Sequence, residues 1–287
     1  MLSLVKTGDP AYNFCMKIGR FAFREKEFTG VVKEGSIVVE LPAISLSSAV
    51  YDGSLFFKDS MPHIEEGGQY HIKDLRFLPL WYPRKILCLG LNYRGHIKEG
   101  DWVPPDEPVY FEKSSSCAIP HHASILLPPD IGRVDPEVEL AAVIGSRAYN
   151  LDPVEAENVI LGWTILNDVT ARGLQRRDQA KKYPWFRSKS MDTFCPFGPW
   201  LVTVDELPSV RDLAIESRIN GRVCQSSTTS EMIFSASEVI SYISKTLTLE
   251  PGDIVSLGTP EGISPIVSGD FVECEICGIG ILANQVI

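Results

Sequence analysis

Short strand-like segments separated by turn residues dominate this chain, and that pattern constrains its fold more than any other feature. The buried strand KILCLGLNY begins at Lys85, and VELAAVIG (residues 138–145) and GWTILNDVTA (residues 162–171) are further strands. IESRINGRVCQSS predicts a hairpin with Asn220-Gly221 at its tip, because Asn-Gly strongly favours tight hairpin turns. EPGD, GTPEG and SGD then separate several C-terminal strands. Because strands do not alternate regularly with helices, the sequence predicts an α+β, mainly β fold and not a doubly wound sheet.

Helix signals are few, and the helices that they predict are short. Residues 94–99 and 44–51 are two candidates. Asp152-Pro153 predicts a helix start, with Asp as N-cap and Pro at the first helical position. SASE (residues 235–238) is a capping box. It opens a helix whose predicted apolar face consists of Val239, Ile240, Ile243 and Leu247.

The texture of the chain changes near residue 80, which predicts two domains. The first part holds the β-like pieces LSLV, RFAF, FTGVV and SIVVEL and the polar stretch HIEEGGQYHIKD. FLPLWYPRK follows with the proline content of a linker. We therefore expect a small β-rich accessory domain over residues 1–80 and a catalytic domain over residues 81–287.

Charge and composition exclude several classes of protein. The 27 Lys and Arg residues against 37 Asp and Glu give a formal net charge of −10, which argues against a nucleic-acid surface. No apolar run approaches the roughly 20 residues that span a bilayer, and the start MLSLVKTGDP has no apolar signal segment. We expect a cytoplasmic protein that binds neither nucleic acid nor membranes.

The seven cysteines are scattered and odd in number, as expected of reduced thiols that fill a core. One pair, Cys274 and Cys277, has CxxC spacing. It lies in an alternating strand pattern, where residues three apart point to opposite faces. The sequence therefore predicts neither a zinc site nor a disulfide scaffold.

The string VDPEVELAAVIG contains the candidate residues that say most about function. Glu137 and Glu139 are two apart at the start of a strand, so both carboxylates lie on one face and repel each other. A divalent cation relieves such repulsion, and hard oxygen ligands favour Mg²⁺, Mn²⁺ or Ca²⁺. Asp168 offers a third carboxylate at a strand end. The alternative is that the glutamates form a solvated edge and Asp168 caps a helix.

Two further segments hold candidate catalytic groups. His96 and Glu99 are three apart on a short helix, so the carboxylate can orient the imidazole as a general base. The alternative for them is a surface ion pair. Lys189 lies in the aromatic, proline-bounded segment PWFRSKSMDTFCPFGPW, where an enclosed ammonium could hold an anionic oxygen. A merely solvated lysine is the other reading.

Taken in order, seven strings resemble the fumarylacetoacetate hydrolase family over about residues 84–287. They are KILCLGLNYRGHIKE, PVYFEKSSS, VDPEVELAAVIG, NDVTAR, PWFRSKSMDTFCPFGPWLVT, INGRVCQSSTTSEMIFS and LEPGDIVSLGTPEGI. The resemblance implies a mixed β-sandwich roll, usually dimeric, in the acylpyruvate hydrolase or 2-hydroxyhepta-2,4-diene-1,7-dioate isomerase branch. We expect a homodimer with the interface mainly on the larger domain.

The resemblance also implies roles for individual residues. The divalent metal, most often Mg²⁺, falls to Glu137, Glu139 and Asp168. His96, Glu99 and Lys189 match the catalytic positions. Gln175 and Thr259 match positions that face the substrate.

Two departures from the family pattern bear on the substrate. Gly173 stands where many relatives have Asp after Ala-Arg, which removes one acidic support on the metal side. The segments GDWVPPDEPVYFEK and CAIPHHAS also differ, and both are expected to shape the substrate pocket.

These parts predict a metal-dependent hydrolase that cleaves a C–C bond in a 2,4-dioxo acid of the acylpyruvate type. His96 would activate water, the metal would act as a Lewis acid, and a metal-bound enolate stabilised by Lys189 would give pyruvate and a carboxylic acid. The alternatives are isomerisation of the dienedioate or decarboxylation of oxaloacetate at the same site. A non-catalytic metal-binding oligomer is a further alternative.

Overall fold

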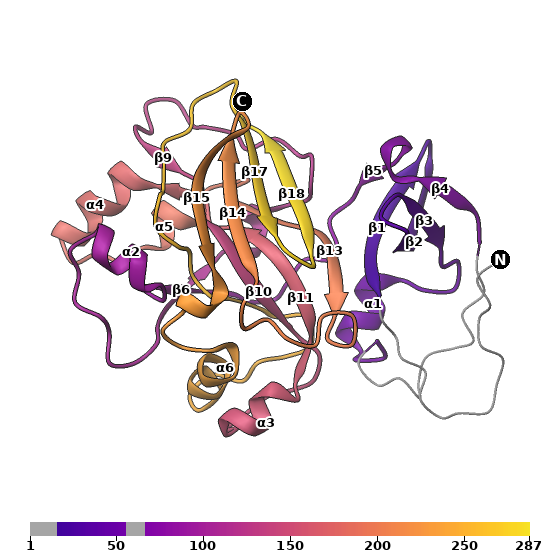
Figure 1. The fold of residues 1–287 in the computed structure, drawn as a ribbon, viewed down its shortest axis with the longest axis horizontal. Coiled ribbons are helices and arrows are strands. Elements are labelled where there is room, and N and C mark those ends of the chain that lie inside the picture. The colour runs from indigo at the N-terminus through magenta and orange to yellow at the C-terminus, as the bar shows by residue number, and fades with distance from the viewer. Residues whose placement is uncertain (1–15, 56–66) are drawn as a thin grey trace.

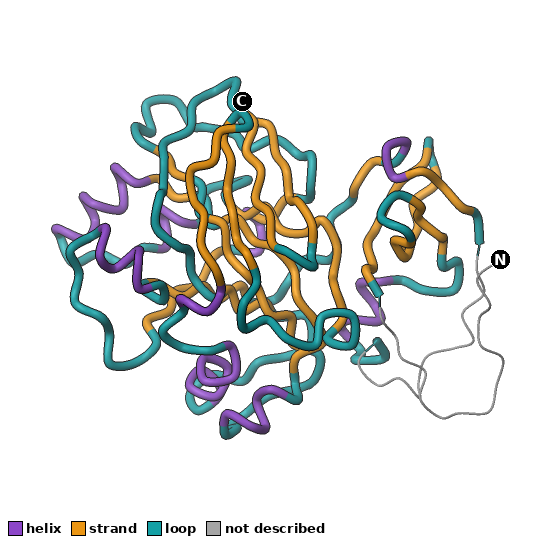
Figure 2. Tube along the Cα trace, in the orientation of Figure 1, coloured by secondary structure: helices purple, strands orange, loops and turns teal. Residues whose placement is uncertain are grey.

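The computed structural model describes residues 16–55 and 67–287. The predicted strand LSLV, Cys15 and His63 lie outside these residues. Strands occupy the centre of the molecule and helices its periphery, as Figure 2 shows. The α+β, mainly β fold predicted from the sequence is confirmed.

The N-terminal part forms a smaller lobe beside the main body (Figure 1). Its elements are strands β1 (Lys17–Phe23), β2 (Lys26–Lys33), β3 (Ile37–Glu40), β4 (Gln69–His71) and β5 (Arg76–Phe77), with helix α1 (Leu46–Tyr51). Helix α1 begins two residues later than predicted because Ser45 is its N-cap and accepts a hydrogen bond from the Ser48 amide. The polar stretch that the sequence left without structure contains β4.

The larger part contains the remaining elements. Its strands are β6 (Ile86–Gly90), β7 (Val109–Lys113), β8 (Ala118–Ile119), β9 (Val134–Asp135), β10 (Val138–Ile144), β11 (Ile160–Asn167), β12 (Thr170–Ala171), β13 (Cys195–Thr203), β14 (Ala214–Ile219), β15 (Arg222–Thr228), β16 (Ile254–Ser256), β17 (Phe271–Ile276) and β18 (Gly280–Gln285). Its helices are α2 (Arg94–Glu99), α3 (Pro153–Glu157), α4 (Arg172–Ala180), α5 (Phe186–Lys189) and α6 (Ala236–Ser244).

One large sheet runs through both parts. Its path is β4-β3-β2-β1-β13-β11-β10-β16-β6-β7, with β5 and β8 paired to β1 and β13. A four-stranded sheet, β15-β14-β17-β18, packs against the larger part of it, and β12 pairs with β9. Strand β1 joins the lobe to the main body by pairing with β13, at Lys17 with Val202 and Ile18 with Leu201. The domain boundary near residue 80 stays a prediction.

Strand β10 lies at the centre of the fold and is buried along its whole length. Leu140 and Ala142 pack in the core between the two sheets. Ala141 and Val143 point to the opposite face and pack in a second core with Leu46 and other residues of the lobe. A strand covered on both faces needs apolar residues at every position, which explains the run VELAAVI. Glu139 interrupts that run on the face of Ala141 and Val143.

Local signals placed several element ends correctly. The hairpin of β14 and β15 turns at Asn220-Gly221, and capping boxes begin α3 at Asp152 and α6 at Ser235. The prediction that Leu247 lies on helix α6 is wrong, because the helix ends at Ser244. Leu247 lies in the following turn, where its amide still donates to the Ile243 carbonyl, and it packs partly buried against the core.

The cysteine and membrane predictions can be compared with the described residues. Cys274, on β17, is buried, whereas Cys277, just after the strand ends at Ile276, is exposed. Among the described residues, no helix has the length and apolar character needed to cross a bilayer.

Candidate active site

Three buried carboxylates meet where β10 begins and β11 ends. One oxygen from each of Glu137, Glu139 and Asp168 lies within 4.8 Å of the other two. The antiparallel pairing of β10 with β11 brings them together, and the Asp168 amide donates to the Glu137 carbonyl at 2.9 Å. The alternative of a solvated edge is wrong, since Glu137 and Glu139 are 4% and 1% exposed. The alternative of an N-cap at Asp168 is also wrong, because Ala171 is the N-cap of α4.

Two buried lysines bind the carboxylate of Asp168 from different elements. Lys113, at the end of β7, donates to Asp168 Oδ1 at 2.6 Å and also to the carbonyls of Val169 and Lys189. Lys189, at the end of α5, donates to Asp168 Oδ2 and, at 2.9 Å, to Glu137 Oε2. Burial lowers the pKa of Lys189, but Asp168 and Glu137 outweigh that effect and raise it. Both ammonium groups are therefore charged, and Lys189 is enclosed as the sequence suggested.

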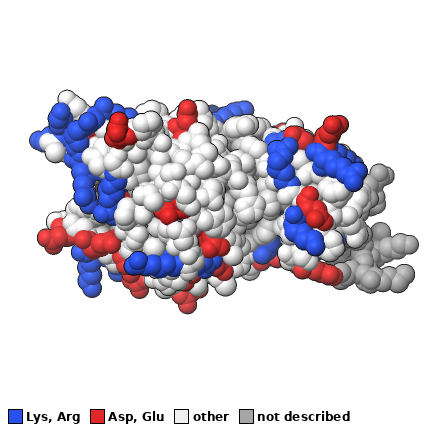
Figure 3. All heavy atoms as spheres, turned by 90° about the horizontal axis from the view of Figure 1, so that it is seen from above, with Lys and Arg blue, Asp and Glu red and all other residues white. Residues whose placement is uncertain are grey.

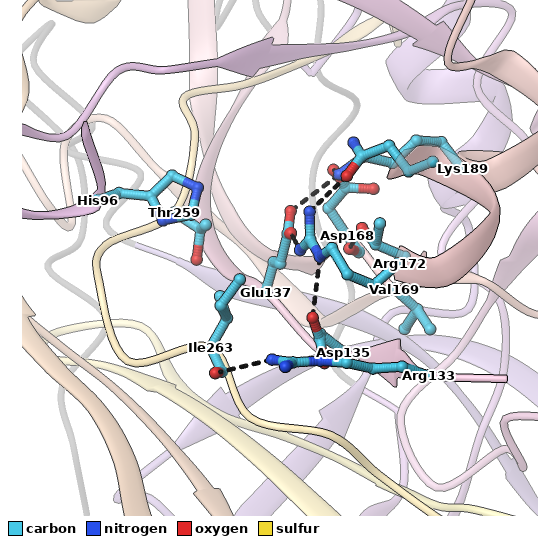
Figure 4. A network of polar contacts seen from close by, with 12 residues as sticks. His96, Arg133, Asp135, Glu137, Asp168, Val169, Arg172, Lys189, Thr259 and Ile263 are labelled. Atoms are coloured by element: carbon cyan, nitrogen blue, oxygen red, sulfur yellow. Dashed lines mark hydrogen bonds and ion pairs between the residues drawn. The ribbon is translucent and has the colours of Figure 1, made fainter. Parts of the chain in front are cut away.

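Arg172 holds the other side of Glu137. Its guanidinium donates to Glu137 Oε1, to Asp135 Oδ2 at 2.8 Å and to Gln175 Oε1 at 2.5 Å (Figure 4). Burial raises the pKa of Glu137, but Lys189 and Arg172 outweigh it and hold that pKa below its usual range. Glu137 is therefore a carboxylate fixed between two cations.

Glu139 has no cation of its own within ion-pair distance among the described residues. Its Oε2 accepts hydrogen bonds from the Ser256 hydroxyl at 2.6 Å and the Gly258 amide at 3.0 Å. Burial, followed by the charges of Asp168 and Glu137, raises its pKa well above the usual range. An uncompensated carboxylate within a cluster of three hard oxygen donors fits a divalent cation, which would favour the ionised form. Together the three carboxylates and their cations form what we call the carboxylate wall.

His96 lies across a cavity from these carboxylates, as Figure 4 shows for His96, Thr259 and Glu137. It is buried on α2, and its Nδ1 is 3.3 Å from Glu99 Oε2. Trp102 packs edge-on against the imidazole, with ring centroids 5.3 Å apart. The surface ion pair considered as an alternative does not describe a buried imidazole. We call α2 and the loop of residues 100–108 the histidine wall.

The second carboxylate oxygen of Glu99 ties the histidine wall to the loop after β16. It accepts a hydrogen bond from the Gly262 amide at 3.2 Å. Gly95 allows this close approach, because a Cβ there would lie 1.9 Å from the Glu261 carboxylate. The loop and α2 therefore position Glu99, which in turn positions His96.

The cavity between the two walls has a volume of about 210 Å³. It is lined by Leu89, Gly90, Leu91, His96, Trp102, Phe111, Glu137, Glu139, Arg172, Gln175, Gln179, Trp185, Lys189 and Thr259. The structure thus brings all the predicted site residues together: six line the cavity, Asp168 joins Glu137 and Glu139 without lining it, and Glu99 contacts His96.

Thr259 and Gln175 both face this cavity but are held differently. The Thr259 hydroxyl donates to the Val138 carbonyl at 2.9 Å and accepts from Gln225 at 2.8 Å. Gln175 Oε1 accepts a hydrogen bond from Arg172, which lies one turn earlier in α4. Their roles toward a substrate stay predictions.

The departures from the family pattern have structural outcomes. Gly173 is exposed, and Arg172 takes its acidic support from Asp135 on β9. GDWVPPDEPVYFEK contributes Trp102 and Phe111 to the cavity, as expected. The expectation for CAIPHHAS is wrong, because its residues are absent from the described lining. Its His121 instead accepts from the Ala283 amide and packs against Phe77, far along the sheet.

Sequence reasoning missed the roles of Lys113, Asp135 and Arg172. Lys113 and Arg172 occur in the strings FEK and TAR, which served only as markers of the resemblance. The available signal was their position: Lys113 is the last residue of β7, and Arg172 directly follows β12. Their burial could not be inferred, because basic residues beside strands are usually solvated.

Comparisons with known proteins show what the chain is similar to. Residues 85–287 match the family described as fumarylacetoacetate (FAA) hydrolase C-terminal. The mitochondrial oxaloacetate tautomerase FAHD2A of Bos taurus is 40% identical over 216 residues, which cover 73% of this chain and 68% of that protein.

Two solved structures resemble the whole chain or its larger part. One is the 5-carboxymethyl-2-hydroxymuconate delta-isomerase from Mycobacterium smegmatis, with 34% identity and a TM-score of 0.79, covering 95% of this chain and 98% of that one. The other is the fumarylpyruvate hydrolase from Pseudomonas aeruginosa in complex with Mn²⁺ and pyruvate. It has 31% identity and a TM-score of 0.69, and covers 74% of this chain and 91% of that one.

Proposed function

The chain belongs to the fumarylacetoacetate hydrolase family, and on that premise we propose that it hydrolyses a C–C bond in a 2,4-dioxo acid of the acylpyruvate type. The observation that carries the proposal is the buried His96–Glu99 pair facing the carboxylate wall across one cavity. Hydrolysis needs a base for water beside groups that bind an anionic substrate, and this cavity has both.

Glu137, Glu139 and Asp168 would hold the metal, which we propose to be Mg²⁺, with Mn²⁺ or Ca²⁺ as alternatives. When bound, it supplies Lewis-acid polarisation to the oxygens of a 2-oxo acid. Similarity to a hydrolase described with Mn²⁺ and pyruvate supports this assignment.

His96 acts as the general base in this proposal. A carboxylate only accepts hydrogen bonds, so the contact with Glu99 places the proton of the neutral imidazole on Nδ1. The lone pair of Nε2 is then available to take a proton from water. Trp102 limits rotation of the ring, and the water attacks the carbonyl farther from the substrate's carboxylate.

Lys189 stabilises the negative charge that develops on the substrate. Its ammonium lines the cavity and is held between Glu137 and Asp168, so it meets the substrate without reorganising. Breaking the C–C bond leaves its electron pair on the pyruvate part as an enolate, which then takes a proton to give pyruvate. The other product is a carboxylic acid.

A second candidate is proton transfer without water, as in the exchange of keto and enol forms of oxaloacetate. The 40% identity to an oxaloacetate tautomerase favours it, and isomerisation of a dienedioate or decarboxylation of oxaloacetate would use the same groups. His96 would then move a proton between substrate atoms instead of activating water.

A product assay separates these activities. The Mg²⁺-loaded protein is incubated with a series of acylpyruvates, with oxaloacetate and with 2-hydroxyhepta-2,4-diene-1,7-dioate, and pyruvate release is measured beside substrate spectra. Release of pyruvate and the matching acid from an acylpyruvate supports the hydrolase. Spectral change in oxaloacetate or the dienedioate alone, without C–C cleavage of any acylpyruvate, contradicts it. The same assay is run on the variant His96→Ala, which removes the proposed base. Its matched control is His71→Ala, at an exposed histidine of β4.

We also propose that the protein is a homodimer in the cytoplasm with its interface mainly on the larger part. Light scattering tests the assembly: a stable particle with the 31.8 kDa mass of one chain would contradict it.

A further inference from the structure

A buried glutamine connects the four-stranded sheet to the start of β10. Gln225 lies on β15, at the edge of that sheet, and is 1% exposed, whereas its neighbours Cys224 and Ser226 are half-buried and exposed. It pairs with Ser217 of β14, and the register of the two strands then skips Cys224, which marks a β-bulge. Bulges redirect side chains beside functional sites. This one adjoins a polar side chain that is directed inward.

The side chain of Gln225 makes four hydrogen bonds. Its Oε1 accepts from the Val138 amide at 3.2 Å and from the Ser217 hydroxyl at 2.9 Å. Its Nε2 donates to the Thr259 hydroxyl and to the Pro260 carbonyl, both at 2.8 Å. The Val138 amide can only donate and the Pro260 carbonyl can only accept, so these two groups fix the orientation of the side-chain amide. Every hydrogen-bonding position of the glutamine is therefore used.

Val138, Gln225 and Thr259 close a ring of three hydrogen bonds. The Thr259 hydroxyl accepts from Gln225 and donates to the Val138 carbonyl at 2.9 Å. Gln225 in turn accepts from the amide of the same Val138. All three residues are buried, where an unmade hydrogen bond is costly. We call these three residues the amide ring, and it holds both backbone polar groups of Val138.

The amide ring acts on the two glutamates of β10 through the backbone between them. Val138 separates Glu137 from Glu139, so the position of its peptide groups sets the separation of the two carboxylates. The Glu137 amide is held as well, because it donates to Asn167 Oδ1 at 2.9 Å. The start of β10 is therefore fixed by side chains where the carboxylates leave it.

The loop after β16 gives Gln225 a second connection to Glu139. The Gly258 amide donates to Glu139 Oε2 at 3.0 Å, and the next two residues are the ones that Gln225 binds. Gly262 lets this loop lie against β15, since a Cβ there would lie 2.2 Å from the Cys224 carbonyl. Gln225 thus holds the loop that orients Glu139.

We propose that Gln225 is a positioning residue of the metal site, which fixes the separation of Glu137 and Glu139 through the amide ring. The inference rests on the metal site of the proposed function and not on the reaction performed there. The ring contains no charged group, so it acts on the site through geometry. Ligands that are already correctly spaced bind a metal ion more tightly than ligands that must rearrange.

Titration calorimetry with Mn²⁺ on the variant Gln225→Met tests this. Met has a similar length and cannot donate a hydrogen bond, so the ring opens. The Kd for Mn²⁺ should rise by about 10-fold, within the range of 10–100-fold for losing an outer partner of a metal ligand. The electron paramagnetic resonance spectrum of bound Mn²⁺ should also change, because the carboxylates are spaced differently.

The matched control is Gln285→Met in the same sheet. Gln285, on β18, donates to the carbonyls of Gly269 and Asp270 at 3.0 and 2.8 Å, and all three residues are absent from the described cavity lining. Its Kd for Mn²⁺ and its spectrum should equal those of wild type.

Thr259→Val opens the same ring at another residue and keeps the shape of the side chain, so it carries the test if Gln225→Met does not fold. Its Kd should also rise by about 10-fold. The double variant should lose about 10-fold and not about 100-fold, because the two residues act through one ring. Its control is Thr229→Val, since the buried Thr229 hydroxyl likewise donates to a carbonyl, of Val210, and accepts from an amide, of Leu213. Losses that multiply in the double variant would overturn the proposal.

A background measurement separates this inference from the metal site itself. Exposed Asp and Glu side chains, red in Figure 3, also attract Mn²⁺, so Glu139→Gln supplies the affinity of a chain with an incomplete site. Wild type that binds Mn²⁺ no better than Glu139→Gln would overturn the metal site and this inference with it. Equally tight binding by wild type, Gln225→Met and Thr259→Val would overturn only the role of Gln225. Neither result depends on which substrate the protein cleaves.

Discussion

The carboxylate wall of the cavity is built on paired strands, whereas the histidine wall is a six-residue helix and a loop. Glu137, Glu139 and Asp168 are almost fully buried, and Lys113, Lys189 and Arg172 bind Glu137 and Asp168 from three other elements. Helix α2 has no side-chain cap at Tyr93, and the side chain of Glu99 is 38% exposed. The first wall is fixed by many mutual contacts and the second by few. We infer that changes on the carboxylate wall affect both metal binding and folding, and changes on the histidine wall affect catalysis alone.

Removing the metal should have the largest effect. Chelation should abolish turnover, and Mg²⁺ or Mn²⁺ should restore it, because the proposed reaction needs the Lewis-acid polarisation that the metal would supply. Glu139→Gln should weaken metal affinity by more than about 100-fold, beyond the 10–100-fold cost of losing an outer partner of a ligand. Titration calorimetry measures the affinity. Full turnover by metal-free protein would contradict the assignment, and unfolding of Glu139→Gln would show that the carboxylate is structural.

The next largest effect is expected on the other wall. His96→Ala should reduce hydrolysis of an acylpyruvate by roughly 10²–10⁴, the range for a general base. Metal affinity and the unfolding midpoint should stay at wild-type values, because His96 is not one of the three carboxylates proposed to hold the metal. Decarboxylation of oxaloacetate needs no attacking water and should fall less. Acylpyruvate cleavage at the wild-type rate would rule out His96 as the base.

Lys113 tests whether folding depends on the carboxylate wall. Lys113→Met leaves one side of Asp168 without its buried partner and should lower the free energy of unfolding by about 3–5 kcal/mol. Denaturant titration measures this. The double variant Lys113→Met/Asp168→Asn removes both charges and should recover part of the loss. A single variant as stable as wild type would show that Lys189 alone neutralises Asp168.

The two walls also differ in how far the sequence predicts them. Glu137, Glu139 and Asp168 follow from strand alternation and from a strand end, both local features. His96 and Glu99 follow from helical spacing. Lys113 and Arg172 could not be found this way, because a basic residue carries no local signal that it is buried, and their acidic partners come from distant strands.

The same limit applies to the fold. Capping boxes and the Asn-Gly turn act through neighbouring residues, so the starts of α3 and α6 and the β14–β15 hairpin were predictable. The pairing of β1 with β13 joins residues about 180 positions apart in sequence through backbone hydrogen bonds, which no side-chain pattern encodes. A boundary near residue 80 was therefore visible in composition, while the shared sheet was not.

The smallest effect is expected at Trp102, which supports the His96 imidazole but takes no part in the proposed chemistry. Trp102 is 43% exposed and touches the imidazole only by its edge, a contact worth about 0.5–1.5 kcal/mol. Trp102→Leu should therefore reduce kcat by about 2- to 10-fold while leaving metal affinity and stability near wild type. Tyr183→Leu, at an exposed aromatic outside the cavity lining, is the matched control and should keep the wild-type kcat. If Trp102→Leu instead lowered the unfolding midpoint as much as Lys113→Met, the loop would be part of the folding core, and the contrast between the two walls would not hold.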